Sequence, residues 1–248
     1  MRILFHKFSY NIKKARAARM KQNSKMIFLG SFFILFLLSV SSFTFPIFVN
    51  QTIHNRNIIY IDPGHGGSDP GKVGSGNVLE KDINLSLSLK LKKILEKANF
   101  KVFLTRNGDY NLASSSTNVK LSDLKNRKQQ IFDQDPIAVI SIHQNSYPSE
   151  EVHGAQVFYY LGSSKSKHLA DSIQSELVKG LDPSNHRKAK SNTDYYLLKN
   201  NPYPTVIVEC GFLSNEEEKQ KLITSSYQKK AAQCIYQGLK EYLSSSSE

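Results

Sequence analysis

Residues 57–67, NIIYIDPGHGG, decide the start of the fold and supply the first candidate site residue. The apolar run Asn57–Asp62 is typical of a buried β-strand, and Pro63 with the glycine after it ends that strand. The next stretch, residues 65–78, contains five glycines and is predicted to form a loop. His65 therefore stands where a strand gives way to a backbone that can bend closely around a ligand.

Strands and helices alternate along the rest of this region. Further strands are predicted at Lys101–Thr105, Ile137–Ile142, Val152–Leu161, Tyr195–Leu198 and Thr205–Cys210. Amphipathic periodicity predicts helices at about residues 83–98, 121–132, 165–180, 215–223 and 227–243, the first of them with Asp82 as its N-cap. We therefore expect a single α/β domain at 57–243, with a twisted, mostly parallel sheet of about six strands flanked by helices on both faces.

The N-terminal segment differs from this domain in composition. Residues 1–25 carry eight Lys or Arg residues and no acid, and residues 26–49 carry no charge. At about 1.5 Å per residue, a helix over the uncharged run can cross a bilayer core of roughly 30 Å. The pattern predicts a cytoplasmic segment at 1–25, a transmembrane signal anchor at 26–49 and a linker at 50–56, with a signal peptide cleaved near Ser39 as the alternative. We expect a single-pass protein of the cell membrane whose C-terminal domain is extracytoplasmic and ends in a frayed tail, 244–248.

The charge balance and the cysteine content restrict the partners and bonds that we expect. The chain carries 33 Lys or Arg and 21 Asp or Glu residues, but eight of the basic residues lie in the N-terminal segment. The other 25 nearly match the 21 acids, whereas nucleic-acid-binding domains show a basic patch or stripe, so no nucleic-acid partner is predicted. Cys210 and Cys234 are predicted to be buried free thiols, although an exported domain would permit a disulfide between them.

Four residues in separate motifs are consistent with one hydrolytic site. His65 and His143 each follow a predicted strand, Glu80 lies at the entry to the first helix, and Glu209 ends the apolar run VIVE. The carboxyl ends of parallel strands meet at one edge of a sheet, so three of these residues are expected to converge there. Two imidazoles and a carboxylate bind zinc and leave a fourth position for water, as in catalytic zinc centres. We therefore predict one Zn²⁺ held by His65, Glu80 and His143, with Glu209 as general base and acid.

Each site assignment has an alternative in which the residue has only a structural role. For Glu209, the alternative is a buried carboxylate that is paired with a Lys or Arg. Arg106, Arg127 and Asn145 are candidate contacts for an anionic peptide or glycan, and surface solvation is the alternative. Asp62 is a candidate partner that holds a ligand imidazole in place, and a residue that forms the turn at the strand end is the alternative.

Six motifs together resemble a known family, the zinc-dependent N-acetylmuramoyl-L-alanine amidases of bacterial cell walls. The motifs are, in order, DPGHGGSDPG, LEKDINL, VFLTRNGD, ISIHQN, GAQVFYY and PTVIVECGFLSNEEE. The resemblance covers about residues 57–243 and implies a twisted sheet flanked by helices. It implies zinc ligands at His65, Glu80 and His143 and a catalytic glutamate at Glu209. The implied reaction is hydrolysis of the amide between the lactyl group of N-acetylmuramic acid and L-alanine of the stem peptide.

A narrower resemblance concerns the spore-cortex amidases that act before germination. It rests on the N-terminal anchor, the RKAK segment at 187–190 and the lack of a recognisable wall-binding repeat. This resemblance implies a role in forming muramic δ-lactam and a location in the forespore intermembrane space. A zinc peptidase that cuts within the stem peptide, a vegetative cell-wall amidase and a non-catalytic wall-binding protein are the alternatives. The need for an activator protein stays open.

Overall fold

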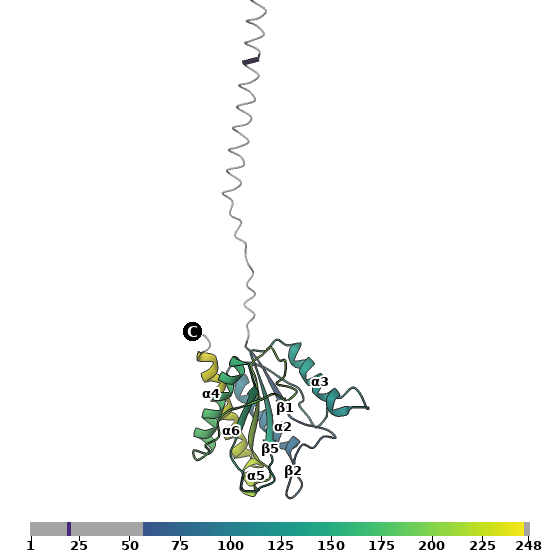
Figure 1. The fold of residues 1–248 in the computed structure, drawn as a ribbon, viewed down its shortest axis with the longest axis vertical. Helices are drawn as coiled ribbons and strands as arrows, with labels where there is room; N and C mark the ends of the chain where they lie inside the picture. Colours follow the sequence, from purple (N-terminus) through teal and green to yellow (C-terminus); the bar gives the residue numbers. More distant parts are fainter. Residues whose placement is uncertain (1–18, 21–56, 246–248) are drawn as a thin grey trace, which may run out of the picture. The chain divides into compact units, whose positions relative to one another are not determined.

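The computed structural model describes residues 19–20 and 57–245, and the part from residue 57 belongs to one compact unit (Figure 1). The predicted cytoplasmic segment (except residues 19–20), the transmembrane segment and the linker lie outside the described residues. Within the described part, no helix has the length and apolar character needed to cross a bilayer.

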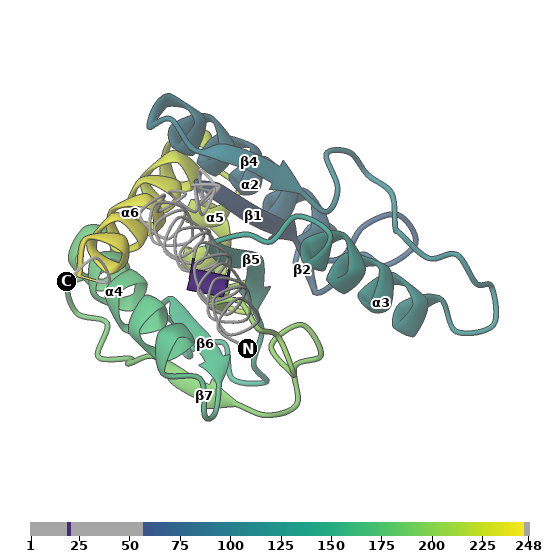
Figure 2. The same cartoon turned by 90° about the horizontal axis from the view of Figure 1, so that it is seen from above.

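Six strands of the described region form one sheet in the order β4-β1-β5-β8-β6-β7 (Figure 2). Their bounds are β1 Ile58–Pro63, β4 Lys101–Leu104, β5 Ala138–Asn145, β6 Gln156–Tyr160, β7 Lys190–Asn192 and β8 Thr205–Phe212. Only the β6–β8 pair is antiparallel, and the other neighbours pair in parallel. A separate hairpin joins β2 Val73–Gly74 to β3 Val78–Leu79. The predicted mostly parallel, six-stranded sheet is confirmed.

Helices cover both faces of this sheet. Their bounds are α2 Glu80–Lys97, α3 Val119–Phe132, α4 Ser164–Leu181, α5 Glu216–Leu222 and α6 Ser225–Ser245. α6 packs against both α2 and α4 on one face, where apolar residues such as Leu91, Ile173 and Ile235 form the main core. On the other face, Ile131 of α3 packs with Tyr60 in a smaller cluster. Because both faces are covered, the central strands contain nearly continuous apolar runs, and most of their polar residues lie towards the carboxyl ends.

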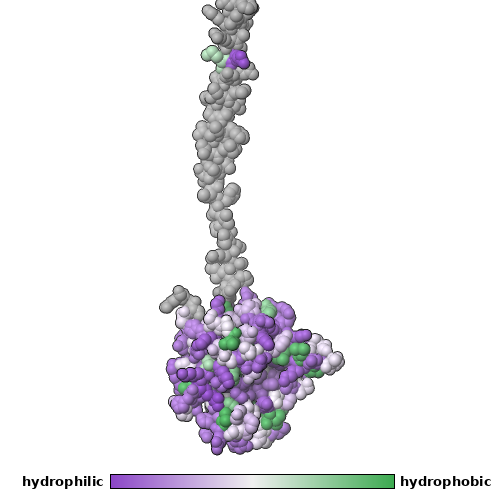
Figure 3. Space-filling view, viewed as in Figure 1, coloured by the Kyte–Doolittle hydropathy of each residue, from purple (hydrophilic) through white to green (hydrophobic). Residues whose placement is uncertain are grey.

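One face of the domain is largely hydrophilic (Figure 3), and both cysteines are buried. The face in Figure 3 is largely hydrophilic, with hydrophobic residues scattered between polar ones. Cys210 and Cys234 are both buried and unpaired, as expected for free thiols. Burial raises the pKa of the Cys210 thiol, so this side chain is held as a neutral, apolar group.

The first helix begins earlier than predicted. α2 starts at Glu80, its N-cap is Leu79, and no side chain caps it, so Asp82 lies inside the first turn. The amides of Glu80 and Lys81 instead donate to the carbonyls of Lys72 and Pro70. The preceding loop thus satisfies the free N–H groups that a capping side chain would otherwise bind.

Other boundaries also differ from the prediction, for example β6, which begins at Gln156 rather than Val152. β5 continues to Asn145, so His143 lies within the strand rather than beyond it. The predicted strand at Tyr195–Leu198 is wrong, since this segment forms turns and the edge strand β7 lies earlier. The Asn192 side chain accepts hydrogen bonds from the amides of Asp194 and Tyr195. These bonds turn the chain, so Tyr195 and Tyr196 do not form an extended strand.

Candidate metal centre

Three predicted ligands converge at the carboxyl end of the sheet. His65 follows β1, Glu80 opens α2, and His143 lies near the end of β5. Their donor atoms all lie within 4.8 Å of one another. Glu80 is central: its Oε2 lies 3.2 Å from Nε2 of His65, and its Oε1 lies 3.0 Å from Nδ1 of His143. Donor atoms around a tetrahedral zinc lie roughly 3.4 Å apart, because each zinc–donor bond is about 2.1 Å long. The donor set therefore fits this metal in both chemistry and spacing.

Glycine is required where the three ligands approach one another. A Cβ atom at Gly64 would lie 2.2 Å from Cε1 of His143, and one at Gly71 would lie 2.5 Å from Oε2 of Glu80. His65 has a φ of 61°, in the left-handed region that a non-glycine residue seldom adopts. The surrounding structure must hold this conformation against its intrinsic cost, as often occurs at functional sites.

Glu80 is held as a buried carboxylate. It is 2% exposed, and its oxygens accept hydrogen bonds from the backbone amides of Lys72 (2.8 Å) and Gln144 (3.1 Å) and from the side chain of Asn84 (3.2 Å). Burial alone would raise its pKa, but the hydrogen bonds and charges of the two histidines outweigh burial and lower the pKa far below its usual range. The group is therefore deprotonated, as a carboxylate ligand must be.

The carboxylate of Asp69, and not that of Asp62, orients the ring of His65. Oδ2 of Asp69 lies 2.8 Å from Nδ1 of His65, which leaves Nε2 facing Glu80. Sequence analysis missed Asp69, and it assigned this kind of contact to Asp62. Asp62 instead accepts hydrogen bonds from Thr105, Ser141 and Arg127. The ring of His143 is held by Glu80 itself; burial lowers its pKa, but the hydrogen bond and charge of Glu80 raise it to about 9.

Glu209 completes the cluster. It is 8% exposed, and its Oε2 is buried with no hydrogen-bond partner among the described residues. Burial, with the nearby charge of Glu80, raises the pKa of Glu209 to about 7 despite the opposing effect of His143. A buried carboxylate oxygen without a hydrogen-bond partner destabilises the fold, so its presence calls for a functional explanation. Its pKa lies near neutral pH, where a general base and acid works best.

These residues line one cavity of about 570 Å³. Asn145 also lines it, and is half-buried, so a substrate in the cavity can reach it. Lys72 and Tyr195 are exposed residues on the same wall, and neither was singled out by sequence analysis. For Tyr195 the local sequence gave no signal, because only the turn after β7 brings this residue to the cavity.

Both arginines are buried, although Arg127 also lines the cavity. Arg106 is 1% exposed and Arg127 is 2% exposed. Arg127 donates to Asp62, Asp123 and the carbonyls of Pro63 and His65. Their burial and these partners favour support of the loop that carries His65 over direct contact with substrate.

Comparison with known proteins agrees with this geometry. Residues 59–241 match the model of a family described as N-acetylmuramoyl-L-alanine amidase. The chain is 40% identical over 189 residues to the germination-specific N-acetylmuramoyl-L-alanine amidase of Bacillus subtilis, which covers 75% of this chain and 79% of that protein. Its structure resembles that of the CwlD amidase from Clostridioides difficile in complex with the GerS lipoprotein, with a TM-score of 0.74, 41% identity and coverage of 76% of this chain and 98% of that one. An N-acetylmuramoyl-L-alanine amidase from Clostridium difficile 630 gives a TM-score of 0.69, 31% identity and coverage of 76% and 97%.

A His-Glu-His cluster beside an unpaired buried carboxylate, at the carboxyl end of a mostly parallel sheet, is typical of a hydrolase that uses a metal ion. Sequence and structural similarity narrow this class to a single family. The chain belongs to the N-acetylmuramoyl-L-alanine amidases and is an enzyme that acts on peptidoglycan.

Proposed function

We propose that this amidase is zinc-dependent and hydrolyses the amide between the lactyl group of N-acetylmuramic acid and L-alanine. The observation that carries the proposal is the convergence of His65, Glu80 and His143 beside Glu209 on one cavity. The donor set of two imidazoles and one carboxylate matches catalytic zinc centres, which keep a position open for water.

The chain's own residues have distinct roles in this proposal. His65, Glu80 and His143 hold the ion, and Asp69 fixes the ring of His65 through its Nδ1. A zinc ion bound there supplies Lewis acidity, which lowers the pKa of a water molecule and polarises a carbonyl group. Glu209, whose side chain lines the cavity, accepts the proton of the attacking water and delivers it to the alanine nitrogen as the amide bond breaks.

Product analysis tests the bond that is cut. The full-length chain, purified in detergent, is incubated with peptidoglycan, and new amino termini and released stem peptides are identified. We expect intact stems that begin with a free L-alanine amine, and loss of this product when a chelator removes the metal. Cleavage within the stem peptide would instead identify a zinc peptidase, and chelator-resistant cleavage would contradict the zinc assignment.

We also propose that the substrate is the spore cortex. The similarity to the germination-specific amidase of Bacillus subtilis and to the CwlD amidase supports this role. In spores of the source organism, deletion of the gene is expected to abolish muramic δ-lactam, and the wild-type gene, but not its Glu209→Gln variant, should restore it. Unchanged δ-lactam in the deletion strain would favour a role in the vegetative wall.

The proposed location is the outer face of a membrane. Support comes from the eight basic residues in 1–25 and the uncharged run at 26–49. We expect the chain to resist alkaline extraction from membranes and its domain to be digested by protease added from the extracytoplasmic side. Quantitative release by alkali would favour the cleaved signal peptide.

A membrane-attached protein partner is part of the proposal as well. Support comes from the related CwlD amidase, whose structure was solved in complex with the GerS lipoprotein. We expect the purified chain to gain amidase activity when the corresponding lipoprotein of the source organism is added. Full amidase activity of the zinc-loaded chain alone would exclude the need for such an activator.

A further inference from the structure

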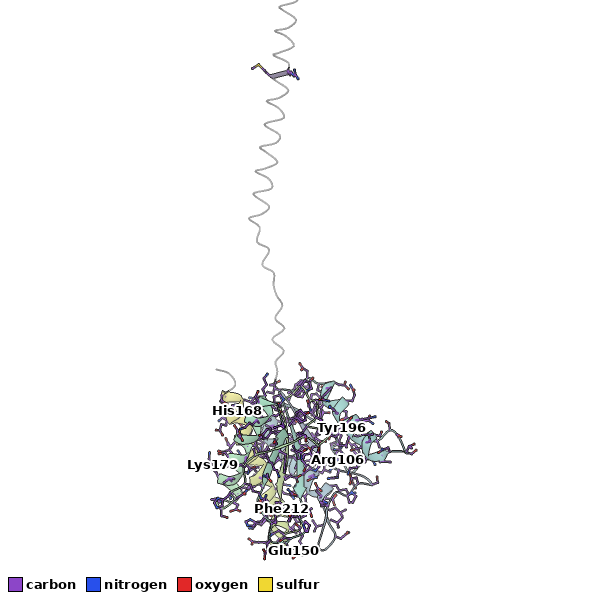
Figure 4. All side chains as sticks on the ribbon, in the orientation of Figure 1. Arg106, Glu150, His168, Lys179, Tyr196 and Phe212 are labelled. Carbon is purple, nitrogen blue, oxygen red and sulfur yellow. The ribbon has the colours of Figure 1, made fainter. Side chains whose placement is uncertain are left out.

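One buried arginine joins the two chain segments that carry the first two ligands. The Nη2 atom of Arg106 donates to the carbonyl of Gly64 at 2.9 Å and to the carbonyl of Lys81 at 2.8 Å. Its Nε donates to Pro63 at 3.0 Å, and its Nη1 donates to Gly108 at 3.0 Å. All four acceptors are backbone carbonyls. Arg106 lies within the body of the domain (Figure 4).

The two carbonyls bound by Nη2 stand next to ligands in sequence. Gly64 precedes His65, and Lys81 follows Glu80. A single nitrogen therefore spans the gap between the loop after β1 and the first turn of α2. The planar guanidinium can bind several carbonyls in fixed directions, whereas the ammonium of a lysine is a single point charge on a flexible stem.

Burying a charged guanidinium costs desolvation free energy, which must be offset by its hydrogen bonds in the fold or by a role in the site. Burial lowers the pKa of Arg106, and the charge of Arg127 adds to this effect. The carboxylates of Asp62 and Asp109 oppose it only in part. The four hydrogen bonds from Arg106 to backbone carbonyls offset part of the desolvation cost. The backbone that Arg106 binds is also the strained one, since it leads directly into the left-handed conformation of His65.

A second, more exposed connection joins the same two segments. The Nζ atom of Lys81 donates to the carbonyl of Gly67 and to Oδ2 of Asp109, both at 2.8 Å. Oδ1 of Asp109 accepts the amide of Gly67 at 2.8 Å. The loop and the start of α2 are thus connected by two separate sets of hydrogen bonds.

We propose that Arg106 is a positioning residue that sets the separation of His65 and Glu80 before the metal binds. This inference rests on the proposed function only in taking these residues as the zinc ligands. Arg106 itself contacts neither ligand side chain in the described structure, and it acts through the backbone of Gly64 and Lys81. The preformed separation raises metal affinity, because less ordering is needed on binding.

The test compares zinc affinity in three full-length chains purified in detergent, by competition with a chromogenic chelator. We expect Arg106→Lys to bind zinc about 10- to 100-fold more weakly than the wild type, the usual effect of losing a group that orients ligands. The control is Leu95→Ala, which removes a fully buried side chain at the far end of α2 and lowers the melting temperature. It should keep wild-type affinity. Equal affinity in Arg106→Lys and the wild type, or an equal loss in both variants, would overturn the proposal.

A second variant and a wild-type measurement cover the case in which Arg106→Lys does not fold. Asp109 is 52% exposed, so Asp109→Ala should fold, and we expect it to bind zinc several-fold more weakly. In the metal-free wild type, the amides of Gly66, Gly67 and Lys81 should already be protected from hydrogen exchange. Unprotected amides, or wild-type affinity in Asp109→Ala, would refute a preformed separation. A wild-type chain that binds no zinc would refute the proposed function instead, which keeps the two failures distinct.

Discussion

His143 of β5 and Glu209 of β8 are register partners on neighbouring parallel strands, and both side chains line the same cavity. Neighbouring strands lie about 4.8 Å apart, so the pairing fixes a candidate ligand and the candidate general base next to each other. Asp62 and Ser141 form the register pair of β1 and β5 on the same face. The sheet thus positions the site with its most rigid part.

The first prediction concerns Glu209. In Glu209→Gln the side chain keeps its size but can no longer accept a proton, so we expect amidase activity to fall by about 10²- to 10⁴-fold. The exposed carboxylate of Glu217 provides the matched control, since Glu217→Gln should stay near wild-type activity. Both variants should retain zinc and thermal stability. Near-normal activity in Glu209→Gln would remove this residue from the mechanism.

A second prediction concerns the close approach of Gly64 to His143. Gly64→Ala places a methyl group 2.2 Å from the ring, so His143 must move away from the other ligands. We expect zinc affinity to fall by about tenfold or more. Gly76→Ala is the control, because Gly76 has a φ of 74° but open space around it, and it should lose only stability. Similar zinc affinities in the two variants would show that the contact with His143 is unimportant.

The acid stability of the domain should depend on Asp62. Burial opposes ionisation, but Arg127, Thr105 and Ser141 lower the pKa of Asp62 from 3.8 to about 2. Because the folded-state pKa is the lower one, this carboxylate stabilises the fold fully above pH about 4 and loses its effect as the pH falls towards 2. The contribution is of order 2 kcal/mol.

Urea unfolding at a series of pH values can measure this contribution. Asp62→Asn should be less stable than the wild type at neutral pH, partly because Arg127 loses its buried partner, and the difference should shrink as the pH falls below about 4. The exposed pair of Lys167 and Asp171 provides the control, since Asp171→Asn should change stability little at any pH. A difference for Asp62→Asn that stays constant down to pH about 2 would contradict the pKa shift.

The convergence of the four candidate residues could be predicted from sequence because each lies in a short motif with a clear place in the topology. His65, His143 and Glu209 lie at the ends of apolar runs, and parallel strands bring such ends together. The alternation of apolar runs and amphipathic segments likewise predicted the sheet and its helices. These features depend on local pattern and on one rule of topology, whereas the strand predicted at Tyr195–Leu198 and several element boundaries were not correct.

The groups that support the site could not be predicted in the same way. The contact of Asp69 with His65 depends on a left-handed turn within the glycine-rich loop. The burial of Arg106 and Arg127 depends on carbonyl groups from distant segments, which no local pattern reveals. An arginine near a candidate site therefore suggested substrate contact, although Arg106 donates to backbone carbonyls and Arg127 donates to carboxylates as well as to loop carbonyls.

The most direct test of the account is the zinc content of the full-length chain and of its Glu80→Gln and Glu209→Gln variants. The expected result is one zinc ion per chain in the wild type and in Glu209→Gln, and loss of most of the zinc in Glu80→Gln, because Glu80 is proposed as a ligand and Glu209 is not. Wild-type zinc content in Glu80→Gln would contradict the site.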